Sequence, residues 1–204
     1  MKIGKTFVSG ILAGISIAIG GLVFLSVENR VIGAALFTVG LFSVCSFGFH
    51  LFTGKVCYVF QNDKEYAIQL PVIWLGNLVG TGVTAGIATL TRAGAGLAEK
   101  AAGLCEVKLS DSLVSLFFLG ILCNILIYIA VEGYGKIQHE TGKYLALLFG
   151  VMVFILCGTE HCVADMFYFS VSGVLATAAA WKFIALAVLG NTIGAVFLRK
   201  ISLS

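Results

Sequence analysis

The stretch Cys157-Gly158-Thr159-Glu160-His161-Cys162-Val163-Ala164-Asp165-Met166-Phe167 places three titratable side chains between two apolar runs. Neither the run before it, 144–159, nor the run after it, 166–181, contains Asp, Glu, Lys or Arg. An ionisable residue at membrane depth is a functional candidate by default, because its burial in lipid is costly. We interpret the stretch as the interrupted centre of a transmembrane helix.

The composition predicts a multi-pass protein of the cell membrane. Of the 204 residues, 59% are hydrophobic and 11% are charged, whereas a soluble domain carries about 25% charged residues. The mean hydropathy is +1.05. A net charge of +3 gives no indication of nucleic acid, and the six cysteines lack the C-x-x-C spacing of a zinc site. We expect no metal, no other cofactor and no enzymatic cluster.

The apolar runs predict six spans, since a span needs roughly 17 to 25 residues. With the N-terminus in the cytoplasm, seven Lys and Arg residues fall inside and five outside, which favours cytoplasmic N- and C-termini. A seven-span alternative, in which 144–159 and 166–181 are separate spans, stays open. The expected spans are 6–27, 31–54, 66–91, 112–131, a fifth beginning at 144, and 183–198.

Two features of the sequence occur once in each half. Gly48 and Gly54 bracket a second point where a helix could break, and Leu-Gly-Asn-x-x-Gly occurs at 75–80 and again at 189–194. Each Gly-Asn span follows an interrupted span, and inverted repeats with paired broken helices mark a substrate pathway between the halves. We predict one channel domain, 1–204, built from inverted three-helix repeats of roughly 1–91 and 108–204.

His161 is the leading candidate for chemistry, because imidazole titrates near neutral pH. Glu160 and Asp165 flank it, and either carboxylate could orient the ring or cap backbone groups freed by the break. A plainer interpretation places Glu160 and His161 in a loop between two ordinary spans.

Four further polar residues have both a functional and a plain interpretation. Thr53, at the first break, could donate to an anion or satisfy its own turn, and Asn124 could line a pore or join two helices. Lys108 could concentrate anions at a pore mouth or be an ordinary surface lysine. The plainer interpretation of Lys55 is that its aliphatic stem is buried while its ammonium group reaches water.

Taken together, these residues resemble the formate/nitrite transporter family of microbial anion channels. The resemblance extends over nearly the whole chain, and its motifs are specific in combination although each alone is weak. They are Leu51-Phe52-Thr53-Gly54, Trp74-Leu75-Gly76-Asn77, Leu119-Gly120-Ile121-Leu122-Cys123-Asn124, Glu160-His161-x-x-x-Asp165-Met166 and Leu189-Gly190-Asn191.

The resemblance implies an all-α, aquaporin-like fold of six helices with helices two and five broken, assembled as a homopentamer in the lipid bilayer. It implies that His161 is the central pore histidine, that Thr53 faces it, and that Lys108 and Asn124 are the vestibule lysine and pore asparagine. Two apolar constrictions are expected at the positions the family uses, namely Phe37, Leu41, Phe52, Ile127 and Phe154.

The expected function is transport of a small monovalent anion with a proton, formate first, with nitrite or hydrosulfide as alternatives. A neutral-solute channel of aquaporin type is a weaker alternative, because it needs Asn-Pro-Ala boxes and the sole proline is Pro71. Two departures from the family pattern stand out: Asp165 replaces a usual Asn, and Lys55 adds a cation near the first break.

Overall fold

A computed structural model describes residues 3–202, which form helices and connecting turns with no strand in that range. Of the predicted domain, residues 1–2 and 203–204 lie outside the described residues. The elements are α1 (Ile3–Ser26), α2 (Arg30–Phe47), α3 (Phe52–Lys55), η1 (Val56–Gln61), α4 (Lys64–Thr89), α5 (Gly94–Ser110), α6 (Leu113–Lys136), α7 (Glu140–Leu156), α8 (Cys162–Val171), η2 (Val174–Ala176) and α9 (Ala178–Ile201).

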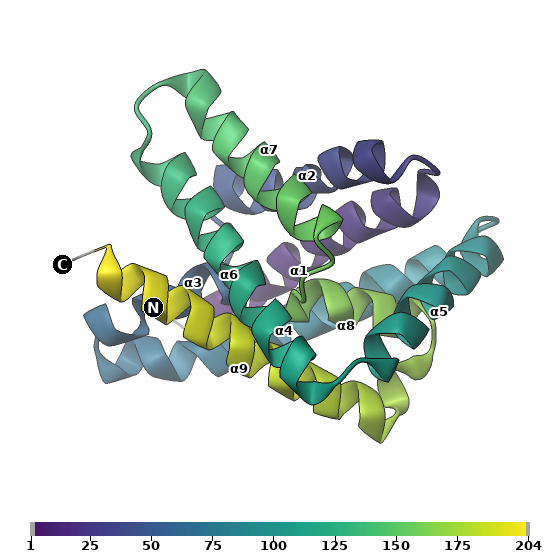
Figure 1. The fold of residues 1–204 in the computed structure, drawn as a ribbon. Coiled ribbons are helices and arrows are strands. Elements are labelled where there is room, and N and C mark those ends of the chain that lie inside the picture. Colours follow the sequence, from purple (N-terminus) through teal and green to yellow (C-terminus); the bar gives the residue numbers. More distant parts are fainter. Residues whose placement is uncertain (1–2, 203–204) are drawn as a thin grey trace.

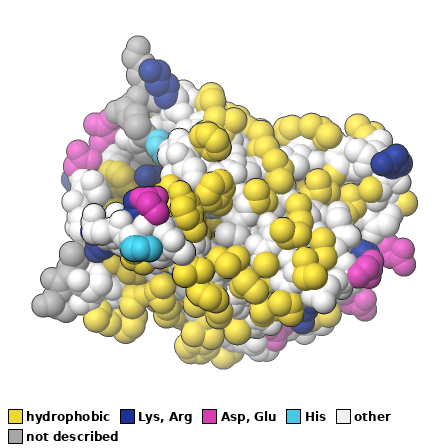
Figure 2. Space-filling view, turned by 90° about the horizontal axis from the view of Figure 1, so that it is seen from above, with side chains coloured by type: hydrophobic (Ala, Val, Ile, Leu, Met, Phe, Trp, Pro, Cys, Tyr) yellow, Lys and Arg dark blue, Asp and Glu magenta, His cyan; other side chains and the backbone are white. Residues whose placement is uncertain are grey.

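The six predicted crossings are confirmed. Helices α1, α2, α4, α6 and α9 are each long and apolar enough to span a membrane. The remaining crossing consists of α7 and α8, which have 17 and 10 residues and meet at the break 157–161. Large apolar side chains such as Ile87 and Phe118 stay exposed. Figure 2 shows hydrophobic side chains over the middle of one face and charged ones gathered toward its two ends, as expected for a bilayer-embedded protein.

The seven-span alternative is wrong. Helix α8 ends at Val171, and a helix of 10 residues rises only about 15 Å, half of the hydrocarbon thickness. Gly173, with φ 78°, then turns the chain before α9 begins at Ala178. Since α8 is buried against α4 and α5 rather than exposed to lipid, it completes the span that α7 begins.

Glycines set the close packing within each half. Helix α1 packs on α4 and α2, and α6 packs on α9 and α7. A Cβ placed on Gly76 would lie 2.9 Å from the Cα of Gly10, and a Cβ on Gly190 would lie 3.0 Å from the Cα of Gly120. Small residues let helix backbones approach closely in lipid, so the two halves use the same kind of contact.

The region 92–111, which lies between two predicted spans and carries spaced charges, forms the continuous 17-residue helix α5. Its buried side includes Leu97, Ala101 and Cys105, spaced four residues apart, and this side packs on α8. Apolar residues four positions apart lie on one face of a helix, so this spacing is typical of a helix rather than a loop. The helix brings Lys108, in its last turn, toward the interior of the molecule.

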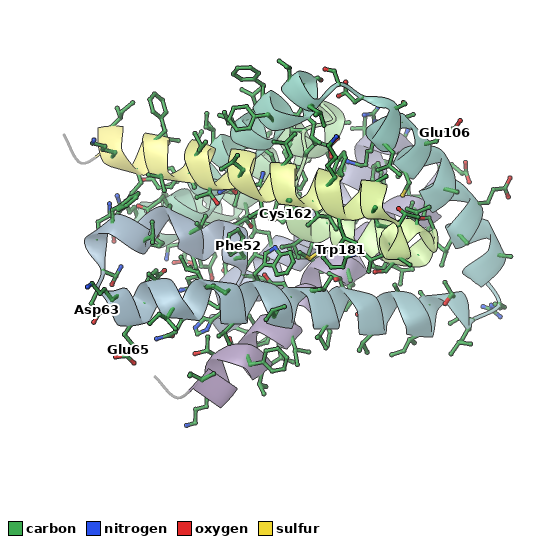
Figure 3. All side chains as sticks on the ribbon, turned by 90° about the horizontal axis from the view of Figure 1, so that it is seen from below. Phe52, Asp63, Glu65, Glu106, Cys162 and Trp181 are labelled. Atoms are coloured by element: carbon green, nitrogen blue, oxygen red, sulfur yellow. The ribbon has the colours of Figure 1, made fainter. Side chains whose placement is uncertain are left out.

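Both ends of the chain lie on one side of the molecule, and α5 lies on the opposite side (Figure 1). Figure 3 places Phe52 and Cys162, the first residues of α3 and α8, near the middle, with Asp63 and Glu65 toward one end and Glu106 toward the other. We call these ends the Lys55 end and the Lys108 end. The two breaks therefore occur at mid-depth.

Candidate functional site

The first break follows α2. Gly48 has φ 69°, in the left-handed region that favours glycine, and ends the helix. The Phe49 N–H donates to the Val44 carbonyl at 3.0 Å, and the His50 N–H points to the Ser9 carbonyl at 3.4 Å. The break lies between Gly48 and Gly54, as predicted, but it ends before Gly54, which lies inside α3. The break is thus shorter than the sequence indicated.

The second break repeats this arrangement 110 positions later. Gly158, with φ 65°, takes the place of Gly48. The Thr159 N–H donates to the Phe154 carbonyl at 3.1 Å, and the Glu160 N–H donates to the Leu119 carbonyl at 3.3 Å. These are the counterparts of the two bonds at the first break, so the two breaks share one backbone geometry.

Asn77 and Asn191 hold the two breaks in the same way. The Asn77 amide donates to the carbonyls of Gly10 (2.8 Å) and His50 (3.0 Å), and its oxygen accepts from the Phe52 N–H at 2.9 Å. Both amides are fully buried. Each therefore satisfies three backbone groups that the interrupted helix leaves free.

The Asn191 bonds correspond one for one. This amide donates to the carbonyls of Gly120 (2.8 Å) and Glu160 (2.7 Å) and accepts from the Cys162 N–H at 3.0 Å. The repeated Leu-Gly-Asn motif is visible in the sequence, but nothing in the sequence predicts the bonds that its amides make. The matching bonds also place His161 where the other half has Leu51.

His161 and Thr53 meet between the two breaks, as the resemblance implied. The His161 Nε2 and the Thr53 Oγ1 are 2.8 Å apart, and the two residues are only 2% and 1% exposed. The Phe154 ring stacks on the imidazole with centroids 5.7 Å apart. The pair is therefore enclosed, with one face of the histidine covered by an aromatic ring.

The protons of this pair follow from the cap of α8. His161 Nδ1 accepts a hydrogen bond from the Ala164 N–H at 3.1 Å, so Nδ1 carries no proton. In the neutral ring the proton is then on Nε2, which donates to the Thr53 hydroxyl. The Thr53 hydroxyl proton is left free to point at a third group. Protonating Nδ1 would remove the cap of α8.

Asn124 closes the site from α6. Its amide donates to the Thr53 carbonyl at 3.1 Å, while its Oδ1 is buried without a hydrogen-bond partner among the described residues. A buried acceptor without a partner is uncommon and calls for an explanation. An acceptor next to Thr53 suits a ligand that can donate a hydrogen bond, such as a protonated acid.

The five residues expected at the constrictions are all buried. Phe37 and Phe154 meet edge to face with centroids 5.7 Å apart. Leu41, Phe52 and Ile127 are 1%, 7% and 2% exposed. The structure thus buries all five side chains and places Phe154 against His161, and their role as constrictions stays a prediction.

A cavity of about 360 Å³ reaches His161 from the Lys108 end. Lys108 forms ion pairs there with Glu160 and, at 2.9 Å, with Asp165. The expectation that a carboxylate orients the imidazole is therefore wrong: both face Lys108. Asp165 Oδ2 and the Tyr168 hydroxyl are buried and lack hydrogen-bond partners within residues 3–202. Lys108 is thus a neutralised cation rather than a free one.

An arginine and an ion pair at the surface complete this end. Arg30, which also lines the cavity, lies within 3.4 Å of the carbonyls of Ile155 and Leu156 at the end of α7. Lys100 on α5 pairs with Glu28 at 2.8 Å, and its hydrogen bond lowers the pKa of Glu28. These contacts tie α2 to α7, and α5 to the loop between α1 and α2.

A smaller cavity of about 170 Å³ lies at the Lys55 end. Its lining includes Leu51, Lys55, Tyr58 and Tyr134. Behind Tyr58, the Glu132 carboxylate accepts a hydrogen bond from the tyrosine hydroxyl and pairs with Lys136 at 2.7 Å and Arg199 at 3.1 Å. Cavities therefore lie at both ends of the molecule, and the enclosed His161–Thr53 pair lies at mid-depth.

Two interrupted helices that meet at a buried polar pair, in a bundle of six crossings, define the class of helical membrane channels and transporters. Over residues 1–203 the sequence matches the formate/nitrite transporter family, and the chain belongs to that family. It is therefore a channel or transporter for small anions and not an enzyme.

Relatives within the family differ in substrate. The chain is 33% identical to the uncharacterized transporter YrhG of Bacillus subtilis, over 98% of this chain and 85% of YrhG. It is 34% identical to the nitrite transporter NirC of Salmonella typhimurium, over 76% of this chain and 60% of NirC. A solved pentameric formate channel with formate bound superposes with a TM-score of 0.82 at 24% identity, over 98% of this chain and 96% of that one. This last likeness shows the fold.

Proposed function

We propose that this chain conducts formate together with a proton across the cell membrane. The observation that carries the proposal is the enclosed His161–Thr53 pair, which is almost fully buried and has the Phe154 ring stacked on the imidazole. Such a site can donate hydrogen bonds to a small planar anion. The pair itself supplies no positive charge that would stabilise the anion as it moves on into apolar surroundings. The likeness in fold to a formate channel supports formate as the first substrate to test.

The proton follows from an energy comparison. Moving a bare carboxylate into a medium of low dielectric constant costs tens of kcal/mol in the idealised limit. Protonating an acid of pKa about 3.5 at pH 7 costs about 5 kcal/mol, at 1.36 kcal/mol per pKa unit. The neutral acid is therefore the species that crosses the apolar constrictions on either side of the pair.

In this mechanism Thr53 donates its hydroxyl hydrogen bond to the anion while His161 Nε2–H holds the threonine oxygen. Asn124 Oδ1 accepts from the acid once it carries its proton. Because Nδ1 is occupied by the cap of α8, the proton reaches the anion from water in the cavities, and His161 acts as the orienting donor.

The proposed assembly is a homopentamer, with one pathway in each protomer. The pentameric formate channel that shares the fold supports it. A native mass measurement of the purified protein in detergent tests it, and a monomer or a dimer would contradict it.

The test of function is flux into liposomes that contain the purified protein. Wild type should take up labelled formate with internal acidification reported by a pH dye. His161→Phe should reduce uptake by tenfold or more, while His161→Gln, which keeps an N–H donor, should retain part of it. His139→Gln, at an exposed histidine, is the matched control. If His161→Phe left proton-coupled uptake unchanged at every pH, the role of His161 would be wrong.

Nitrite is the second candidate, because the relative NirC is described as a nitrite transporter. The same vesicles should be assayed with nitrite, hydrosulfide and glycerol. A higher rate for nitrite or hydrosulfide than for formate would replace formate as the substrate, and glycerol flux alone would contradict an anion pathway.

A further inference from the structure

Lys55 and Asp165 occupy the same position in the two halves of the molecule. The Lys55 N–H donates to the Leu51 carbonyl at 3.0 Å, and the Asp165 N–H donates to the His161 carbonyl at 2.9 Å. The two residues are 110 positions apart, the shift that relates the backbone-to-backbone bonds at the two breaks. The repeat therefore places a cation beside one cavity and an anion beside the other.

At the Lys55 end, the smaller of the two cavities that Lys55 lines contains no counter-charge for it. Lys55 is the one formally charged residue among those that line the cavity of about 170 Å³. Its ammonium forms no ion pair within 4 Å with any residue in the range 3–202. Glu132, behind the wall of this cavity, is already paired with two cations, Lys136 and Arg199.

At the Lys108 end, positive and negative charges cancel. The cavity of about 360 Å³ is lined by Arg30 and Lys108 and by Glu160 and Asp165. Lys108 contacts both carboxylates, so its charge is directed at them and not at the cavity. An anion in this cavity finds no net charge, whereas an anion in the cavity of about 170 Å³ at the Lys55 end finds one cation.

A second cavity, of about 400 Å³, also borders Lys55 and extends toward that end of the molecule, where Asp63 and Glu65 lie (Figure 3). Asp63 caps α4 by accepting the Tyr66 N–H at 2.9 Å. These carboxylates weaken the attraction that Lys55 exerts on an incoming anion. We therefore expect the removal of Lys55 to change the KM by several-fold and not by more.

We propose that Lys55 recruits the monovalent anion at the Lys55 end, and that Asp165 abolishes the corresponding attraction at the Lys108 end. This inference rests on the proposed anion transport. A passive pathway cannot favour one direction at equilibrium, so the asymmetry is expected in the KM measured from each face. The KM should be lower from the Lys55 end.

The test is labelled formate flux at low ionic strength, in vesicles whose protein orientation is read by protease removal of a C-terminal tag. Lys55→Gln should raise the KM from the Lys55 end about fivefold, an estimate for one unit charge near the ligand in water. The KM from the Lys108 end should stay within twofold. Lys55→Arg should restore the wild-type value, and high salt should erase the difference.

Two further variants sharpen the outcome. Lys64→Gln removes an exposed charge at the same end that lines neither cavity, and it should leave both KM values unchanged. Asp165→Asn should lower the KM from the Lys108 end. Equal KM values from both faces of a transporting wild type, or equal effects of Lys55→Gln on both faces, would overturn this inference alone. Wild-type vesicles that pass neither formate nor nitrite would overturn the proposed function together with it.

Discussion

His161 combines two tasks in one ring at the centre of the molecule. Its Nδ1 caps α8 and its Nε2 holds Thr53, so the folded chain fixes both the position and the proton arrangement of the imidazole. Leu51, at the matching place in the other half, has no capping side chain. The histidine of the site therefore comes from one half, and the other half contributes Thr53, two residues beyond that leucine.

The ion cluster at Lys108 should behave as one unit. Lys108→Met would leave Glu160 and Asp165 facing each other in a buried site, which we expect to cost roughly 3 to 5 kcal/mol. Adding Asp165→Asn should recover a large part of that loss, because one of the two unpaired charges is then removed. Thermal unfolding of the three variants in detergent measures the coupling.

Lys100→Met is the matched control for this cluster, since Lys100 on the same helix is 44% exposed and pairs with the exposed Glu28. It should change stability by no more than about 1 kcal/mol. If Lys108→Met unfolded at the same temperature as Lys100→Met, the cluster would not be the stabilising unit described. Additive effects of Lys108→Met and Asp165→Asn would equally contradict the coupling.

At the scale of elements, the two interrupted helices depend on Asn77 and Asn191. Asn191→Ala would leave three buried backbone groups without partners, at about 1 to 3 kcal/mol each. Asn77→Ala would do the same at the other break. We expect each variant to lose more than about 3 kcal/mol of stability and to lose flux in the surviving protein.

The control for the asparagines is Asn62→Ala, because the Asn62 amide donates a single hydrogen bond, to Tyr58, at an exposed turn. It should be nearly neutral in a thermal unfolding assay. If Asn191→Ala were as stable as wild type, water would be able to replace the amide at the break. The repeated Leu-Gly-Asn motif would then not be needed to hold the breaks.

The elements also show what the sequence could and could not predict. The breaks were visible because charges at 160–165 interrupt apolar runs, and Gly48 marks the other break. The pairing of Thr53 with His161 came from the family resemblance, since 108 residues separate them. The Lys108–Asp165 pair was not predicted. It depends on α5 being one continuous helix, and the spaced charges of 92–111 concealed its buried side.

At the scale of the whole molecule, the two ends differ in charge around a common apolar middle. The Lys55 end holds one acid between two cations, Glu132 with Lys136 and Arg199, and the Lys108 end holds one cation between two acids. This inversion accompanies a fold whose halves share the same backbone bonds at their breaks. The apolar scaffold repeats, and the charges on it distinguish the two faces.

Orientation in the membrane is the prediction that belongs to this scale. Lys and Arg are retained on the cytoplasmic side of short loops, and Arg199 and Lys200 fall in the last turn of α9 at the Lys55 end. We therefore expect both termini in the cytoplasm, which makes the Lys55 end the cytoplasmic face. Green fluorescent protein fused after residue 204 should fluoresce, and alkaline phosphatase fused after Thr91 should be active.

The two reporters test separate parts of this prediction. An inactive phosphatase at Thr91 together with a dark C-terminal fusion would mean that the whole molecule is inverted, with Lys55 facing outward. Because six crossings return the chain to its starting side, a fluorescent C-terminus and an exported N-terminus cannot occur together in this fold. A tag at the N-terminus that protease reaches from outside, combined with C-terminal fluorescence, would contradict the six-crossing topology itself, whatever the direction of transport.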